Sequence, residues 1–235
     1  MLVPFDAKKL DALMEEAGLA LLLANTRHNV RYLTGGYYFH FHAQATRIGR
    51  SQYLPFVGLP HQRLEEAFYI GRPDERGQIE AEGLWISRRP TASRGTVSAA
   101  EAAAQSVQGL GLAEATIGVE LPFLPADAFL ALQRALPRAH FVDATPVLDG
   151  LRAVKTPREL ALLRTVYDRT AEAIQATFAS ATPGITTAAI ADQVRQEMSR
   201  RGLTFLWAFT CAGPGTLRAP SSARWERGRV LHIDA

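Results

Sequence analysis

The chain has 235 residues, 47% of them hydrophobic, which supplies a core for one large domain or two modest ones. Its 26 Lys and Arg against 23 Asp and Glu leave a formal net charge of +3, without the clustered excess that binding a nucleic-acid backbone requires. No apolar run approaches the roughly 20 residues of a membrane-spanning helix, and the N-terminus is acidic where a signal peptide would be apolar. We therefore expect a cytoplasmic protein that binds neither nucleic acid nor membrane.

The first half of the chain alternates between helix and strand signals. Residues 6–17 predict a helix that ends at Gly18, and the continuous apolar run at 19–24 predicts a buried strand. Ser98 and Glu101 have the spacing of a capping box. Short apolar runs predict further strands at 53–59, 67–70, 84–87, 116–119 and 140–142, and helices at 98–108 and 125–136. This alternation predicts an α/β layer architecture for residues 1–150.

The second half, residues 151–235, starts with a strong helix signal. Thr156-Pro157-Arg158-Glu159 supplies a capping hydroxyl, a proline at the first helical position and a glutamate three residues after the cap. Apolar residues then recur at spacings of three and four as far as Phe178, which predicts a long amphipathic helix with one apolar stripe. The remaining signals predict a helix at 187–201 that buries Ile190, Val194 and Met198, and strands at 203–211 and 230–233.

Taken in order, several segments resemble the creatinase, aminopeptidase P and prolidase family of pita-bread hydrolases. They are residues 29–35 and 154–160, the turn at 183–186 and the strand at 228–234. The resemblance implies a creatinase-like N-terminal α/β domain over 1–150, followed by a partial α+β pita-bread domain over 151–235. It also implies a homodimer that hydrolyses a C–N bond, most often the peptide bond next to proline.

Members of that family bind two divalent metal ions (Mn, Co or Zn) through two aspartates, a histidine and two glutamates, and Asp234 resembles the first aspartate. Two hard cations activate a bridging water, which needs several converging carboxylates. The chain ends at Ala235, so we expect a catalytically incomplete protein that does not bind both ions. The family also places a substrate-contacting histidine near Pro220, where this chain has none. Altered substrate handling, a non-peptide substrate and lost activity therefore all stay open.

His40 and His42 are candidate substrate-binding residues. On a strand they would point to one side, a spacing that some metal sites use. In family dimers a loop of this domain reaches the neighbouring subunit's active site. Metal binding and a packing or interface role for the aromatic run Tyr37–His42 are the alternatives.

Other chemistries find little support in the sequence. Gly109-Leu110-Gly111 lacks the third glycine of a dinucleotide fingerprint, and no serine-hydrolase elbow or phosphate-binding loop occurs. Cys211, the only cysteine, falls in a predicted apolar strand and is expected to be a buried structural thiol. The main alternative to an enzyme is a non-catalytic dimerisation remnant, because a truncated sheet exposes strand edges. A fragment of a longer gene product is the third possibility.

Overall fold

A computed structural model describes residues 3–47, 53–213 and 218–235. The chain forms two compact units, Met1–Val154 and Lys155–Ala235. The division therefore follows Val154, whereas the predicted boundary followed residue 150. Among the described residues, no helix is long and apolar enough to cross a membrane.

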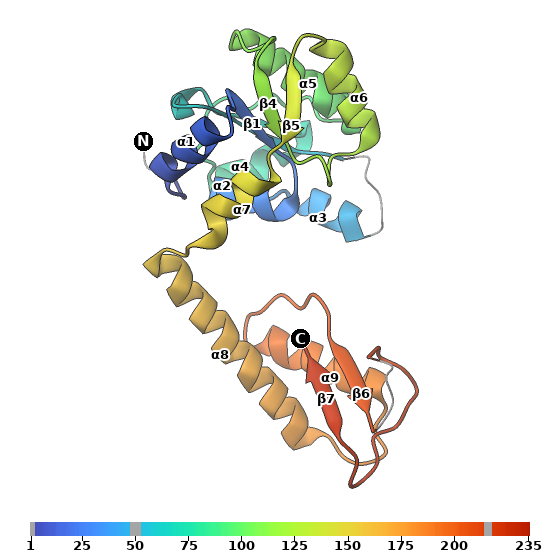
Figure 1. The fold of residues 1–235 in the computed structure, drawn as a ribbon. Coiled ribbons are helices and arrows are strands. Elements are labelled where there is room, and N and C mark those ends of the chain that lie inside the picture. Colours follow the sequence, from blue (N-terminus) through green and yellow to red (C-terminus); the bar gives the residue numbers. More distant parts are fainter. Residues whose placement is uncertain (1–2, 48–52, 214–217) are drawn as a thin grey trace. The chain divides into compact units, whose positions relative to one another are not determined.

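The N-terminal unit is built on a five-stranded mixed sheet (Figure 1) with the strand order β3-β2-β1-β4-β5. The strands are β1 (Leu21–Ala24), β2 (Phe56–Pro60), β3 (Phe68–Ile70), β4 (Thr116–Val119) and β5 (His140–Asp143). β1 pairs antiparallel with β2 and parallel with β4, while β2–β3 is antiparallel and β4–β5 is parallel. This arrangement is the expected α/β architecture.

Helices cover both faces of this sheet. α5 (Thr96–Gly109) and α6 (Ala126–Ala135) pack on the face that includes Leu21 and Leu23. The other face, which includes Leu22 and Ala24, packs against α1 (Ala7–Glu16), α2 (Arg27–Thr34) and α7 (Thr145–Ala153). Because successive strand side chains point to opposite faces, every residue of β1 is buried, which explains its continuous apolar run. α3 (His40–Arg47), α4 (Arg76–Glu82) and the 3-10 turns Leu64–Glu66 and Pro73–Glu75 complete the unit.

Two local predictions for this unit are wrong. Residues 84–87 do not form a strand; the following residue, Arg88, makes only an isolated bridge to Phe68. Ser98 does not cap α5, because that helix begins at Thr96 and the Ser98 hydroxyl donates back to the carbonyl of Gly95. In both cases contacts with neighbouring segments override a short local pattern.

The C-terminal unit pairs two helices with a two-stranded antiparallel sheet. The elements are α8 (Pro157–Ser180), α9 (Thr187–Arg200), β6 (Phe209–Ala212) and β7 (Leu231–Asp234). The capping box of α8 is confirmed, since the Glu159 N–H donates to Thr156 Oγ1 at 3.2 Å and the Thr156 N–H donates to Glu159 Oε2 at 2.7 Å. α9 buries Ile190, Val194 and Met198 as predicted.

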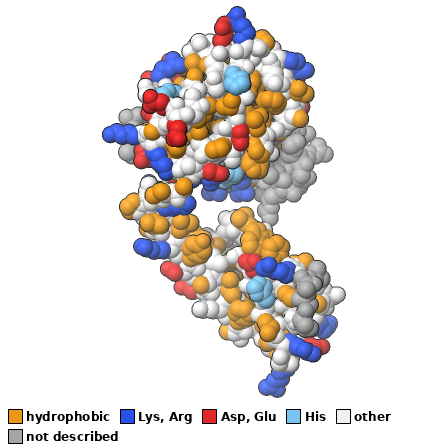
Figure 2. Space-filling view, in the orientation of Figure 1, with side chains coloured by type: hydrophobic (Ala, Val, Ile, Leu, Met, Phe, Trp, Pro, Cys, Tyr) orange, Lys and Arg blue, Asp and Glu red, His pale blue; other side chains and the backbone are white. Residues whose placement is uncertain are grey.

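Much of the apolar stripe of α8 is exposed in the part of the chain that the structure describes. Tyr167 is 71% exposed and Leu162, just beside the stripe, is 60% exposed. α8 buries only Ala173 and Thr177. Both lie in the C-terminal half of the helix, which packs against α9. Hydrophobic side chains consequently lie at the surface of this unit (Figure 2). α8 is amphipathic, but among the described residues its apolar stripe finds packing partners only along the half that contacts α9.

Candidate functional site

The end of α2 sets the path of the chain into the aromatic run at residues 37–42. Gly35 adopts a left-handed φ of 80°, which ends the helix, and an added Cβ there would lie 3.2 Å from Pro4. The Thr34 hydroxyl then donates to the carbonyl of Tyr37 at 2.8 Å. These contacts direct the chain into α3.

Glu75 is the buried anchor of this region. Its Oε2 accepts hydrogen bonds from Tyr37 Oη at 2.6 Å and Tyr69 Oη at 2.9 Å, and its other oxygen accepts one from the backbone N–H of Arg72. Burial raises the pKa of the Glu75 carboxyl, and the donated hydrogen bonds oppose that shift. Burial together with the Glu75 carboxylate raises the pKa of Tyr37, so its hydroxyl stays a donor at neutral pH. The network ties the start of α3 to β3 and the turn before α4.

His40 and His42 do not point to the same side. They lie in a helix, where residues two apart are about 200° apart around the axis. His42 is 1% exposed and packs against the rings of Tyr38, Phe39 and Tyr53 at centroid distances of 5.9, 5.4 and 6.5 Å. His40 is exposed, with its Nε2 3.7 Å from Glu82 Oε1. The strand-based idea of a paired site is therefore wrong.

The environment of His42 keeps its imidazole neutral at physiological pH. Burial, and then the positive charge of Arg72, lower the pKa of His42 to about 4. His42 thus contributes an uncharged ring to an aromatic cluster, while His40 presents its ring to solvent.

Beside this cluster, Arg72 is held in a fixed orientation. Its guanidinium lies 4.8 Å from the ring centroid of Phe41 and 4.4 Å from that of Tyr53. It also donates to both carboxylate oxygens of Asp74, at 2.8 and 3.0 Å. This pairing raises the pKa of Arg72 and lowers that of Asp74.

A hollow of about 400 Å³ opens at this arginine, lined by Tyr53, Arg72, Pro73, Asp74 and Arg94. Two guanidinium groups against one carboxylate make its wall net positive, so it suits an anionic group such as a carboxylate. Sequence reasoning missed Arg72 and Arg94, because they lie far along the chain from the aromatic run and belong to no motif.

Asp234 lies at the end of β7 and is paired with an arginine. Arg218 Nη2 donates to Asp234 Oδ2 at 2.7 Å and lies 3.4 Å from Nε2 of His232. The carboxylate side chain is 43% exposed. Asp234 thus ends a strand, and the partner of its carboxylate is the Arg218 guanidinium of the same unit.

The described residues do not by themselves fit a pair of divalent metal ions. Two cations need several carboxylates from different strands. Within residues 3–47, 53–213 and 218–235, no group of three or more His, Cys, Asp or Glu side chains is placed to hold a metal ion. Asp234 contributes one carboxylate, and that carboxylate is bound to a guanidinium.

Two other positions considered in the sequence belong to the same unit. Cys211, in β6, is half-buried rather than fully buried. Pro220 stands near the place where the resembling family has a histidine, and it is exposed. The next residue, Ser221, donates its backbone N–H to Thr187 Oγ1 at 2.9 Å.

Known proteins resemble the N-terminal unit in sequence and nearly the whole chain in fold. A family model described as the Creatinase/Prolidase N-terminal domain matches residues 7–154. No match was found among curated protein sequences.

Solved structures of peptidases resemble nearly the whole chain. An Xaa-Pro dipeptidase from Bacillus anthracis gives a TM-score of 0.75 at 16% identity, covering 97% of this chain and 59% of that one. A prolidase from Pyrococcus horikoshii OT3 gives 0.73 at 16% identity, with coverages of 97% and 59%. An X-Pro aminopeptidase from Thermotoga maritima gives 0.72 at 18% identity, with coverages of 97% and 60%. The chain thus shares their fold and spans about three-fifths of their length.

Proposed function

Because the chain belongs to the Creatinase/Prolidase N-terminal domain family, we propose that it is part of a metallohydrolase of the Xaa-Pro peptidase type, which hydrolyses a C–N bond. The observation that carries the proposal is the likeness of fold over 97% of the chain to an Xaa-Pro dipeptidase, a prolidase and an X-Pro aminopeptidase. In this proposal the C-terminal unit is the opening part of a pita-bread domain, with two helices followed by its first strands.

Asp234 is proposed as the first metal-binding carboxylate of that domain. Its place at the end of β7 supports this role, because a carboxylate carried on a strand is rigidly aimed. The other carboxylates and a general base would have to come from outside these 235 residues. Two divalent ions, when bound, would supply an activated water and polarise the scissile carbonyl.

The N-terminal unit is proposed to contact substrate through the region around α3. His40 is the better placed of the two histidines, because it is exposed while His42 is buried in the aromatic cluster. The positive hollow at Arg72 and Arg94 suits the carboxylate of a peptide substrate. His42 would then act as a neutral packing residue that positions α3.

The test is metal content together with peptide hydrolysis. The 235-residue protein is purified, dialysed and analysed for Mn, Co and Zn per chain, then assayed on a dipeptide that ends in proline and on a tripeptide with proline second. We expect less than one metal ion per chain and no turnover by this chain alone. A longer product of the same reading frame, if it exists, should hydrolyse one of these peptides and lose that activity in Asp234→Ala and with a chelator. Turnover that survives Asp234→Ala would refute the assigned role.

A non-catalytic interaction module is the second candidate, and the exposed apolar surface of the C-terminal unit favours it. Leu206 is 69% exposed and Val230 is 74% exposed, and β7 is an edge of its two-stranded sheet. Such surfaces are covered by further chain or by a partner. A stable, defined oligomer that binds no metal, with no longer product encoded, would favour this function over the hydrolase.

A further inference from the structure

Two polar side chains of β7 lie on the same face of its two-stranded sheet. Ile233 packs against the core of the C-terminal unit, so its neighbours His232 and Asp234 point to the other side. His232 is exposed, and the side chain of Asp234 is 43% exposed. β7 therefore presents an imidazole and a carboxylate next to each other on a face that solvent reaches.

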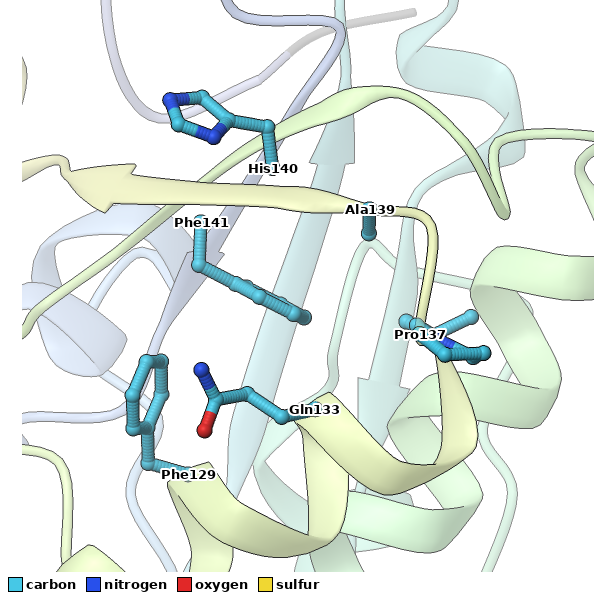
Figure 3. Close-up of a pocket in the computed structure, with 7 residues that line it drawn as sticks. Phe129, Gln133, Pro137, Ala139, His140 and Phe141 are labelled. Carbon is cyan, nitrogen blue, oxygen red and sulfur yellow. The ribbon is translucent and has the colours of Figure 1, made fainter.

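The histidine of β5 lacks this arrangement. His140 is followed two residues later by Val142, and Asp143 lies on the opposite face of the strand. Figure 3 shows the His140 ring on the other side of the strand from Phe141, which faces a hollow of about 210 Å³. None of the seven residues that line this hollow is acidic. His140 is thus a strand histidine without a carboxylate beside it.

A single nitrogen of Arg218 lies within reach of both polar side chains of β7. Its Nη2 is 2.7 Å from Asp234 Oδ2 and 3.4 Å from His232 Nε2. The guanidinium carbon is 5.8 Å from the ring centroid of Phe209, the residue opposite Asp234 in β6. The imidazole nitrogen and the carboxylate oxygen therefore converge on one positive charge, which is the arrangement that a bound cation needs.

We propose that His232 and Asp234 form a binding site for one divalent ion of the zinc, cobalt or nickel class, and that the Arg218 guanidinium competes with the ion for this site. Imidazole suits these metals, whereas magnesium and calcium prefer oxygen ligands. The ion and the Arg218 nitrogen cannot occupy the same space between the two ligands, so the guanidinium leaves when the ion binds. The proposal rests on the metal-binding role proposed for Asp234, and it adds a second ligand and a competing cation.

The competition is weak enough for a metal ion to overcome. The Arg218 side chain is 55% exposed and that of Asp234 is 43% exposed. An ion pair as exposed as this changes an equilibrium by about five-fold at most. Arg218 therefore lowers the affinity of the site for the ion but does not abolish binding.

Isothermal titration calorimetry with Co²⁺ on the 235-residue chain tests the competition. All proteins carry Cys211→Ser, because Cys211 lies opposite His232 in the sheet and a thiolate is itself a metal ligand. Arg218→Gln should lower the dissociation constant for Co²⁺ by about five-fold. Arg195→Gln, which breaks an exposed pair with Asp192 in α9, changes the net charge equally and should leave that constant unchanged. No gain with Arg218→Gln, or an equal gain with Arg195→Gln, would overturn the proposal.

Further variants in the Arg218→Gln background identify the ligands. His232→Asn and Asp234→Asn should each weaken Co²⁺ binding by about ten-fold or more, because even the outer partners of a metal ligand contribute that much. His140→Asn should have no effect, and the circular dichroism of all variants should match. Binding that survives both ligand substitutions would refute the site. Peptide hydrolysis does not enter this test, so its failure would leave the proposed function standing, whereas hydrolysis that survives Asp234→Ala would count against that function alone.

Discussion

His42 makes the stability of the N-terminal unit depend on pH, and the size of the effect follows from its burial. The folded pKa is about 4, whereas an unfolded histidine titrates near 6.5. Because the folded value is depressed, the stabilisation is present above about pH 6.5 and is lost as the pH falls toward 4. Linkage gives a loss of about 2 kcal/mol in the free energy of unfolding between pH 7 and pH 5.

The assay compares the wild type with His42→Phe, which keeps an aromatic ring but cannot be protonated. Urea unfolding is followed at pH 5, 6 and 7 with Trp207 and Trp225 replaced by Phe, so that Trp85 alone reports the N-terminal unit. Other titrating groups contribute equally to both proteins, and the difference between their curves isolates His42. His40→Phe, at an exposed position in the same helix, is the matched control. Equal pH slopes for the wild type and His42→Phe would refute the reasoning.

Three further pairs of substitutions, each a test variant with its control, test the fold. Glu120 is 1% exposed and accepts hydrogen bonds from the backbone N–H groups of Asn25 and Thr26 and from the side chains of Thr26 and Asn29; Glu120→Ala should therefore cost about 3 to 5 kcal/mol in urea unfolding. Glu114→Ala, which breaks a surface ion pair with Arg138, should cost less than about 1 kcal/mol, and equal losses would contradict the argument. Gly58→Ala would place a Cβ in collision with the Phe68 ring and should lower the free energy of unfolding by about 1 to 3 kcal/mol or more. Gly77→Ala, with no neighbouring atom within 4 Å, should be neutral or stabilising in the same melts. Thr156→Ala removes the α8 cap and should destabilise the C-terminal unit by about 1 kcal/mol, whereas Thr156→Ser should not.

The candidate site was only partly accessible from the sequence. The aromatic run at residues 37–42 drew attention because rings and histidines are concentrated there, yet its helical conformation was not recognised. With the segment read as a strand, both histidines face one way; in α3 one is exposed and the other is buried. Arg72 and Glu75 could not be assigned to this site, because their partners Tyr53, Tyr37 and Tyr69 come from separate segments.

Asp234 illustrates a similar limit in the C-terminal unit. Its position at the end of a strand was predictable from the order of segments around residues 228–234, and β7 confirms that strand. The pairing with Arg218 was not predictable, because that arginine precedes Asp234 by 16 residues and belongs to an irregular segment. A side chain that approaches across a loop leaves no periodic signal.

By itself, the sequence determined the local elements whose signals are short-range: the capping box at Thr156, the helices ending at Gly18 and Gly202, and the apolar strands of the central sheet. These depend on hydrogen bonds and periodicity within a few residues of chain. Only the tertiary structure decided that α8 leaves much of its apolar stripe exposed, that Arg72 joins the rings of Phe41 and Tyr53, and that β5 is the last strand of the sheet among the described residues. Each of these depends on which distant segment lies beside a residue, and burial, pKa and strand pairing follow from that placement.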